Sequence, residues 1–82
     1  MRLVKEIPHE RYRITVHIYN AKYLVKIELG QFEQIFKISE TDVYSLDEID
    51  KMLTPELLSN TLVRFVQMRE DWEKAFQLKN VQ

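Results

Sequence analysis

Three segments of alternating apolar and polar residues dominate the first half of the chain. Residues 11–19 read RYRITVHIY, residues 23–29 read YLVKIEL, and residues 32–38 read FEQIFKI. Alternation with a period of two is typical of a β-strand that buries one face. The connections contain Asn20-Ala21 and Gly30-Gln31, which suit tight hairpin turns. We therefore predict a three-stranded antiparallel meander.

The two turns also predict the register of the strands. A type II′ turn at Gly30-Gln31 and a two-residue turn at Asn20-Ala21 both place inward-facing side chains opposite one another. A shift of one residue would turn a whole apolar row toward water, so the register is strongly specified. The predicted partners are Leu29 with Phe32, Val25 with Phe36, Tyr23 with Ile38, Val16 with Val25, Ile14 with Ile27, and Arg13 with Glu28.

Residues 2–7, RLVKEI, form a candidate short edge strand, because Pro8 follows them and proline is tolerated at sheet edges. Two helices follow the meander. Ser45 and Glu48 have the spacing of a capping box, which predicts a short helix from about residue 46 to residue 53. Thr54 and Pro55 then predict the start of a long amphipathic helix that runs to Leu78 and packs on one sheet face. The predicted fold class is α+β, in one domain over residues 1–82.

The long helix is longer than the sheet it packs on. Its 24 residues span ~36 Å, whereas a strand of eight residues spans ~26 Å. The overhang contains large apolar side chains, which a soluble monomer rarely leaves uncovered. Trp72 is either a core residue that the N-terminal segment covers or part of an interface with a second copy. The candidate interface residues are Met68, Trp72, Phe76 and Leu78.

Charge is distributed unevenly along the chain. Residues 1–39 contain seven Lys or Arg and four Glu (+3), and residues 40–82 contain five basic and nine acidic residues (−4), which sum to the net charge of −1. The uneven charge indicates either a basic sheet that packs beside acidic helices or a basic sheet face that binds nucleic acid. Glu28 and Glu33 lie on the same outer sheet face as these basic residues, and Glu28 is expected to neutralise Arg13 across the strands, which reduces the positive charge of this face. The candidate nucleic-acid contacts are Arg11, Arg13, Tyr19, Lys26 and Lys37.

Catalytic chemistry has little support in the residue pattern. The chain has no cysteine, a single glycine, and two histidines, His9 and His17, outside any metal-binding spacing. We predict no catalytic residues, cofactor or metal. No segment approaches the ~20 apolar residues of a membrane span, and the N-terminus lacks a signal peptide, so we expect a cytoplasmic protein without membrane contact.

The leading hypothesis is a small non-catalytic interaction protein that forms a homodimer through the distal half of its long helix. Nucleic-acid binding through the outer sheet face is the alternative, and a small enzyme is the third, least favoured class.

Overall fold

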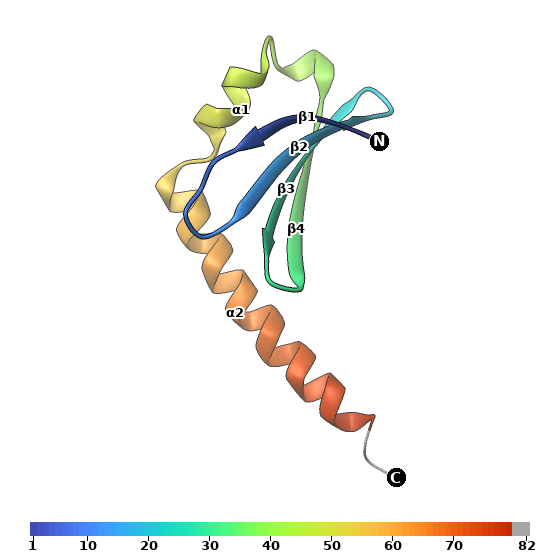
Figure 1. Ribbon diagram of the computed structural model, residues 1–82, viewed down its shortest axis with the longest axis vertical. Helices are drawn as coiled ribbons and strands as arrows, with labels where there is room; N and C mark the ends of the chain where they lie inside the picture. Colours follow the sequence, from blue (N-terminus) through green and yellow to red (C-terminus); the bar gives the residue numbers. More distant parts are fainter. Residues whose placement is uncertain (80–82) are drawn as a thin grey trace.

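The computed structural model describes residues 1–79 and contains one antiparallel sheet and two α-helices (Figure 1). The four strands lie in the order β1-β2-β3-β4, so each strand is a neighbour of the next along the chain. Their bounds are β1 Arg2–Ile7, β2 Arg13–Tyr19, β3 Lys22–Leu29 and β4 Phe32–Ser39. A 3-10 turn (η1, Glu40–Asp42), a short helix (α1, Leu46–Met52) and a long helix (α2, Pro55–Leu78) follow.

The predicted meander and its register are confirmed in β2, β3 and β4. Every predicted pair is found, from Ile14 with Ile27 to Tyr23 with Ile38. Asn20 and Ala21 both have positive φ, and Gly30 does as well, as the predicted turns require.

The N-terminal segment forms a fourth strand, so it is a part of the sheet and does not fold over the end of α2. β1 pairs with β2 and contains a bulge between Leu3 and Lys5. Lys5 Nζ lies 2.7 Å from Asp50 Oδ2 and 3.5 Å from Asp47 Oδ1, which attaches this edge strand to α1. The hydrogen bond to Asp50 and the nearby carboxylates raise the pKa of Lys5 above its ordinary value.

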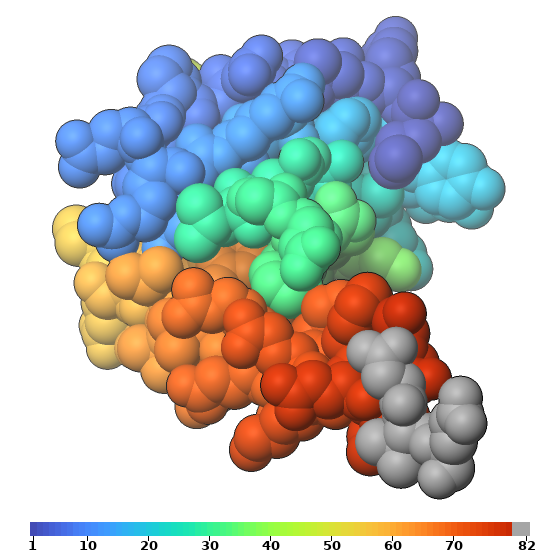
Figure 2. All heavy atoms as spheres, turned by 60° about the horizontal axis from the view of Figure 1, so that its bottom comes forward, coloured from blue at the N-terminus to red at the C-terminus, as the bar shows by residue number. Residues whose placement is uncertain are grey.

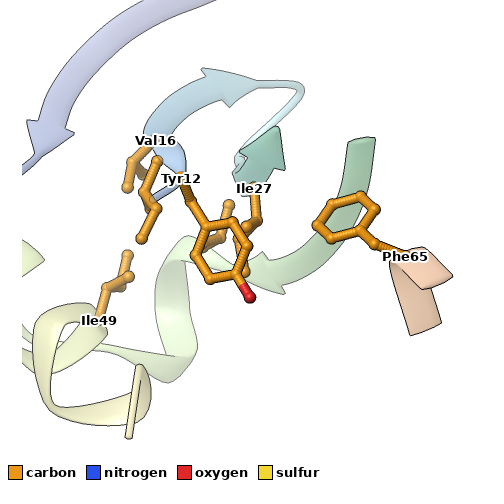
Figure 3. Packing of buried hydrophobic residues seen from close by; sticks show 7 residues of the cluster. Tyr12, Val16, Ile27, Ile49 and Phe65 are labelled. Atoms are coloured by element: carbon orange, nitrogen blue, oxygen red, sulfur yellow. The ribbon is translucent and has the colours of Figure 1, made fainter. Parts of the chain in front are cut away.

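The core lies between the inner face of the sheet, α1 and the first half of α2 (Figure 3). The ring centroids of Tyr12 and Phe65 are 6.0 Å apart. The hydroxyl of Tyr12 donates a hydrogen bond to the carbonyl of Leu58 at 3.0 Å, so this core aromatic also attaches the start of β2 to α2. The buried hydrophobic residues are Tyr12, Ile14, Val16, Val25, Ile27, Ile49 and Phe65.

Local polar contacts position the first half of α2. The helix begins where Thr54 and Pro55 predict, and Thr54 Oγ1 accepts a hydrogen bond from the Leu57 amide at 3.1 Å. Gln34, which interrupts the apolar inner face of β4, donates from Nε2 to the carbonyl of Thr61 at 3.0 Å. The polar residue in that apolar row therefore has a partner on the helix.

Two local expectations were wrong. The Ser45 side chain makes no capping hydrogen bond, although α1 begins directly after it. Arg13 stands opposite Glu28 but forms its ion pair with Glu6 on β1, at 3.8 Å. Thr15 alternates with the core residues Ile14 and Val16 and therefore lies on the outer sheet face, yet it is buried, and its hydroxyl lacks a hydrogen-bond partner among residues 1–79.

The expectation that Trp72 is a core residue was also wrong, because 51% of its surface remains exposed. The core ends near Met68, and α2 continues past the sheet for about three turns. Within residues 1–79, neither helix combines the length and apolar character needed to cross a bilayer.

Candidate protein-interaction surface

The second half of α2 leaves the body of the molecule (Figure 1). Every residue from 69 to 79 is exposed, although the helix runs on to Leu78. The molecule measures 53 × 28 × 18 Å, and this protruding helix extends its long dimension. The protruding segment therefore presents its side chains to solvent on all sides.

Two aromatic side chains lie on the protruding segment, on the same side of the helix as the core. Trp72 follows the buried Phe65 by seven residues, about two turns, and Phe76 follows Trp72 by four. Their ring centroids lie 6.4 Å apart in an edge-to-face arrangement. The Lys79 ammonium lies 4.7 Å from the centroid of Phe76. We call Met68, Trp72 and Phe76 the distal aromatic face.

Leu78, the fourth predicted interface residue, lies on a different side of the helix. It follows Phe76 by two residues and is therefore rotated about 200° from it around the axis. Its side chain is exposed. A partner that contacts the distal aromatic face would have to wrap around α2 to contact Leu78 as well.

Two grooves connect the distal aromatic face with the sheet. One, of about 370 Å³, lies between the β3–β4 hairpin and α2, and Phe32, Leu62 and Val66 are among its walls. The other, of about 390 Å³, is lined by Trp72 and Phe76 together with three polar residues. Gln31 at the hairpin tip lines both grooves. Figure 2 shows this contact region, with the hairpin (green) beside α2 (orange to red).

The outer sheet face carries less free positive charge than its sequence indicates. Lys26 Nζ lies 3.0 Å from Glu28 Oε1 and 3.8 Å from Glu33 Oε2. Arg13 Nε lies 3.8 Å from Glu6 Oε1, and both side chains remain largely exposed. Among the candidate nucleic-acid contacts, Arg11, Arg13, Tyr19 and Lys37 are exposed, and Lys26 is half-buried.

His9 has a structural role in the loop between β1 and β2. Its Nδ1 accepts hydrogen bonds from the backbone amides of Arg11 and Tyr12, at 3.0 and 3.2 Å. Its ring stacks on Tyr12, with centroids 4.9 Å apart. A hollow of about 380 Å³ adjoins it, with Ser59 also in its lining. Because Nδ1 already accepts two backbone hydrogen bonds, it is not free to act as a base or a metal ligand.

His17 lies apart from that loop, on β2. Over residues 1–79, no group of three or more His, Asp or Glu side chains is arranged to hold a metal ion.

Sequence reasoning missed the groove walls Gln31, Phe32 and Val66. No pattern in the sequence shows the direction in which α2 crosses the sheet, and that direction brings the hairpin tip next to the helix. The free edge of β4 was also missed, although a signal for it existed: the meander predicts β4 as its last strand, with no partner on one side.

Comparison of the chain with protein families, with curated proteins and with solved structures finds no match. The functional proposal therefore depends on the geometry of this chain alone.

Proposed function

We propose that this chain is a non-catalytic interaction protein that forms a homodimer through the distal half of α2. The observation that carries the proposal is the position of Trp72 and Phe76. Both side chains continue the core-facing side of α2 beyond the sheet, and 51% and 53% of their surfaces are exposed. Exposed aromatic residues grouped in this way are typical of interaction sites.

The helical state of the protruding segment also favours a partner. Isolated helices shorter than about 12–15 residues are marginal in water, and most helical stability in proteins comes from packing. The segment from 69 to 78 packs little against the rest of the chain, since all of its residues are exposed. A protein surface against the distal aromatic face would supply the missing packing.

A second copy of this chain fits the chemistry of the segment. Residues 69–79 contain three basic residues (Arg69, Lys74, Lys79) and three acidic ones (Glu70, Asp71, Glu73), so their net charge is zero. Two such segments therefore approach one another without net repulsion. Each copy also offers the apolar groove walls Phe32, Leu62 and Val66 to the aromatic rings of the other. In a dimer with two-fold symmetry, each of these contacts would occur twice.

The aromatic rings alone are too small for a stable interface. A buried Trp or Phe removes about 150–250 Å² from water, so the exposed halves of four rings in two copies supply about 400 Å². Stable interfaces bury about 1,200–2,000 Å² in total. The interface must therefore include the groove walls and further surface of each chain.

The test is the effect of Trp72→Ala on the mass of the protein in solution. We expect a dimer for the natural chain at tens of micromolar by light scattering, and a dissociation constant about 30-fold higher or more for the variant, as for a central aromatic contact. Val63→Ala is the matched control, because Val63 is exposed but lies on the opposite side of α2.

The control variant should keep the mass of a dimer. A natural chain that is monomeric at these concentrations would refute the proposal. So would Val63→Ala and Trp72→Ala variants that dissociate to the same extent.

A further inference from the structure

β4 is an open edge of the sheet. It stands at the end of the strand order and pairs only with β3. Within residues 1–79, the hydrogen bonds outside the regular elements include none to the backbone of residues 33–38. One side of β4 therefore presents unpaired amides and carbonyls, which can bind another strand.

The two edges of the sheet differ in their protection against such pairing. β1 contains a bulge at Leu3/Lys5, directs a charged lysine toward α1, and is followed by Pro8. These features discourage edge pairing. β4 is eight residues long, with an uninterrupted register and neither proline nor glycine. Ile35 and Phe36, at its centre, are 46% and 41% exposed.

The hairpin determines which backbone groups of β4 face outward. Leu29 and Phe32 flank the two-residue turn and form the hydrogen-bonded pair that closes it. Hydrogen-bonded and non-hydrogen-bonded pairs alternate along an antiparallel ladder. The amides and carbonyls of Glu33, Ile35 and Lys37 therefore point away from β3, toward the free side.

These three residues are complementary to a second copy of themselves. In antiparallel pairing centred on Ile35, Glu33 of one copy stands opposite Lys37 of the other, twice. Opposite charges in cross-strand positions are favourable and like charges are unfavourable. Centring the pairing on Glu33 or on Lys37 would set like charges opposite one another. On the inner face, the same register sets Phe32 opposite Ile38, which are both apolar.

We propose that β4 pairs antiparallel with β4 of a second copy, centred on Ile35, so that two four-stranded sheets become one continuous sheet. The inference rests on the proposed function only in that the partner is another copy of this chain. Three pairs of outward-facing residues, each exchanging two hydrogen bonds, add about six backbone hydrogen bonds to the dimer. The pairing is isologous, so it closes at two copies.

A single cysteine tests the register directly, because the natural chain has none. In Ile35→Cys, the two copies place their cysteines opposite one another, with Cα atoms about 5.5 Å apart, which a disulfide can bridge. We expect rapid formation of a covalent dimer under mild oxidation. In the matched control Lys37→Cys, the two cysteines are four residues out of register, about 13 Å apart, and should not cross-link.

Failure of Ile35→Cys to cross-link would overturn the β4 pairing. Equal cross-linking of both variants would overturn it as well, because that result indicates random collision.

A charge exchange gives an independent readout. Lys37→Glu sets a carboxylate opposite Glu33 in both symmetry-related pairs, so we expect the dimer to dissociate about tenfold more readily. The double variant Glu33→Lys with Lys37→Glu restores opposite charges at both places and should recover the affinity. A double variant as weak as Lys37→Glu alone would contradict the proposed register.

The two dimer surfaces can fail separately. If Trp72→Ala dissociates the dimer but Ile35→Cys does not form a covalent dimer, the α2 interface is supported and β4 pairing is refuted. Cross-linking at Ile35→Cys in a chain whose mass is insensitive to Trp72→Ala supports β4 pairing and refutes the α2 interface.

Discussion

Three residues in the hairpin turns have positive φ angles, a backbone conformation that most side chains disfavour. Asn20, Ala21 and Gly30 have φ angles of 51°, 59° and 61°. Glycine and asparagine adopt positive φ readily. Ala21 has neither glycine's freedom nor asparagine's local hydrogen bonding, so the first turn contains strain that the second turn avoids.

Ala21→Gly should therefore stabilise the fold. Relief of the left-handed conformation is worth about 1–2 kcal/mol, and the extra flexibility of glycine in the unfolded chain removes about 0.5–1 kcal/mol of it. We expect a net gain of about 0.5–1 kcal/mol in the free energy of unfolding, measured by chemical denaturation.

Gly30→Ala is the counterpart and should lose about 1 kcal/mol. A Cβ at Gly30 would have no atom within 4 Å, so the loss would come from the backbone alone. If Ala21→Gly and Gly30→Ala both lower the free energy of unfolding, backbone strain at Ala21 does not reduce the stability of the natural chain.

Among the elements, β1 is linked to α1 by a charged side chain as well as by the apolar core. Lys5 and Asp50 are 45 residues apart in sequence, and their contact is a direct polar link between the N-terminal strand and the first helix. The sequence predicted β1 as an optional strand, because six residues with weak alternation carry little information. Its ion pair could not be predicted, since it depends on where α1 lies over the sheet.

The Lys5 contact predicts a dependence of stability on alkaline pH. The pKa of Lys5 is raised above the ordinary value of 10.5, so the charged form is favoured by folding. Its contribution is fully present below pH 10.5 and is lost as the pH rises through the higher pKa of the folded state.

The measurement is the difference in unfolding free energy between the natural chain and Lys5→Met. The difference should be constant from about pH 7 to pH 10 and shrink above that range. Lys51→Met is the matched control, because it removes an exposed lysine of α1 that has no ion pair among residues 1–79. A constant difference for Lys5→Met would contradict the raised pKa.

In the whole molecule, a basic sheet lies against acidic helices. Residues 1–39 have a charge of +3 and residues 40–82 have −4. Part of the basic charge is neutralised within the fold, by Asp50 at Lys5 and by glutamates at Arg13 and Lys26. The sheet therefore offers a nucleic acid fewer free cations than its composition indicates.

We accordingly expect a flat fluorescence-anisotropy titration with labelled DNA and RNA, even at low salt, where phosphate contacts are strongest. Lys26→Ala should not change this result, because Lys26 is already paired with Glu28. Tight binding that weakens steeply with salt would instead favour the nucleic-acid alternative.

The sequence by itself determined the three meander strands, their register and the bounds of α2. Those features depend on nearest neighbours: side-chain alternation, two-residue turns, and the cap at Thr54 and Pro55. The sequence also predicted that α2 would extend beyond the sheet, since the length of the helix and the length of the strands both follow from residue counts.

Only the tertiary structure decided the exposure of Trp72, the partner of Lys5 and the grooves beside Gln31. Each of these depends on the angle at which α2 crosses the sheet and on where α1 lies. A helical period shows which face of α2 is apolar but not how far along that face the sheet extends. The candidate interface was therefore predictable as a set of residues on α2, whereas its surroundings were not.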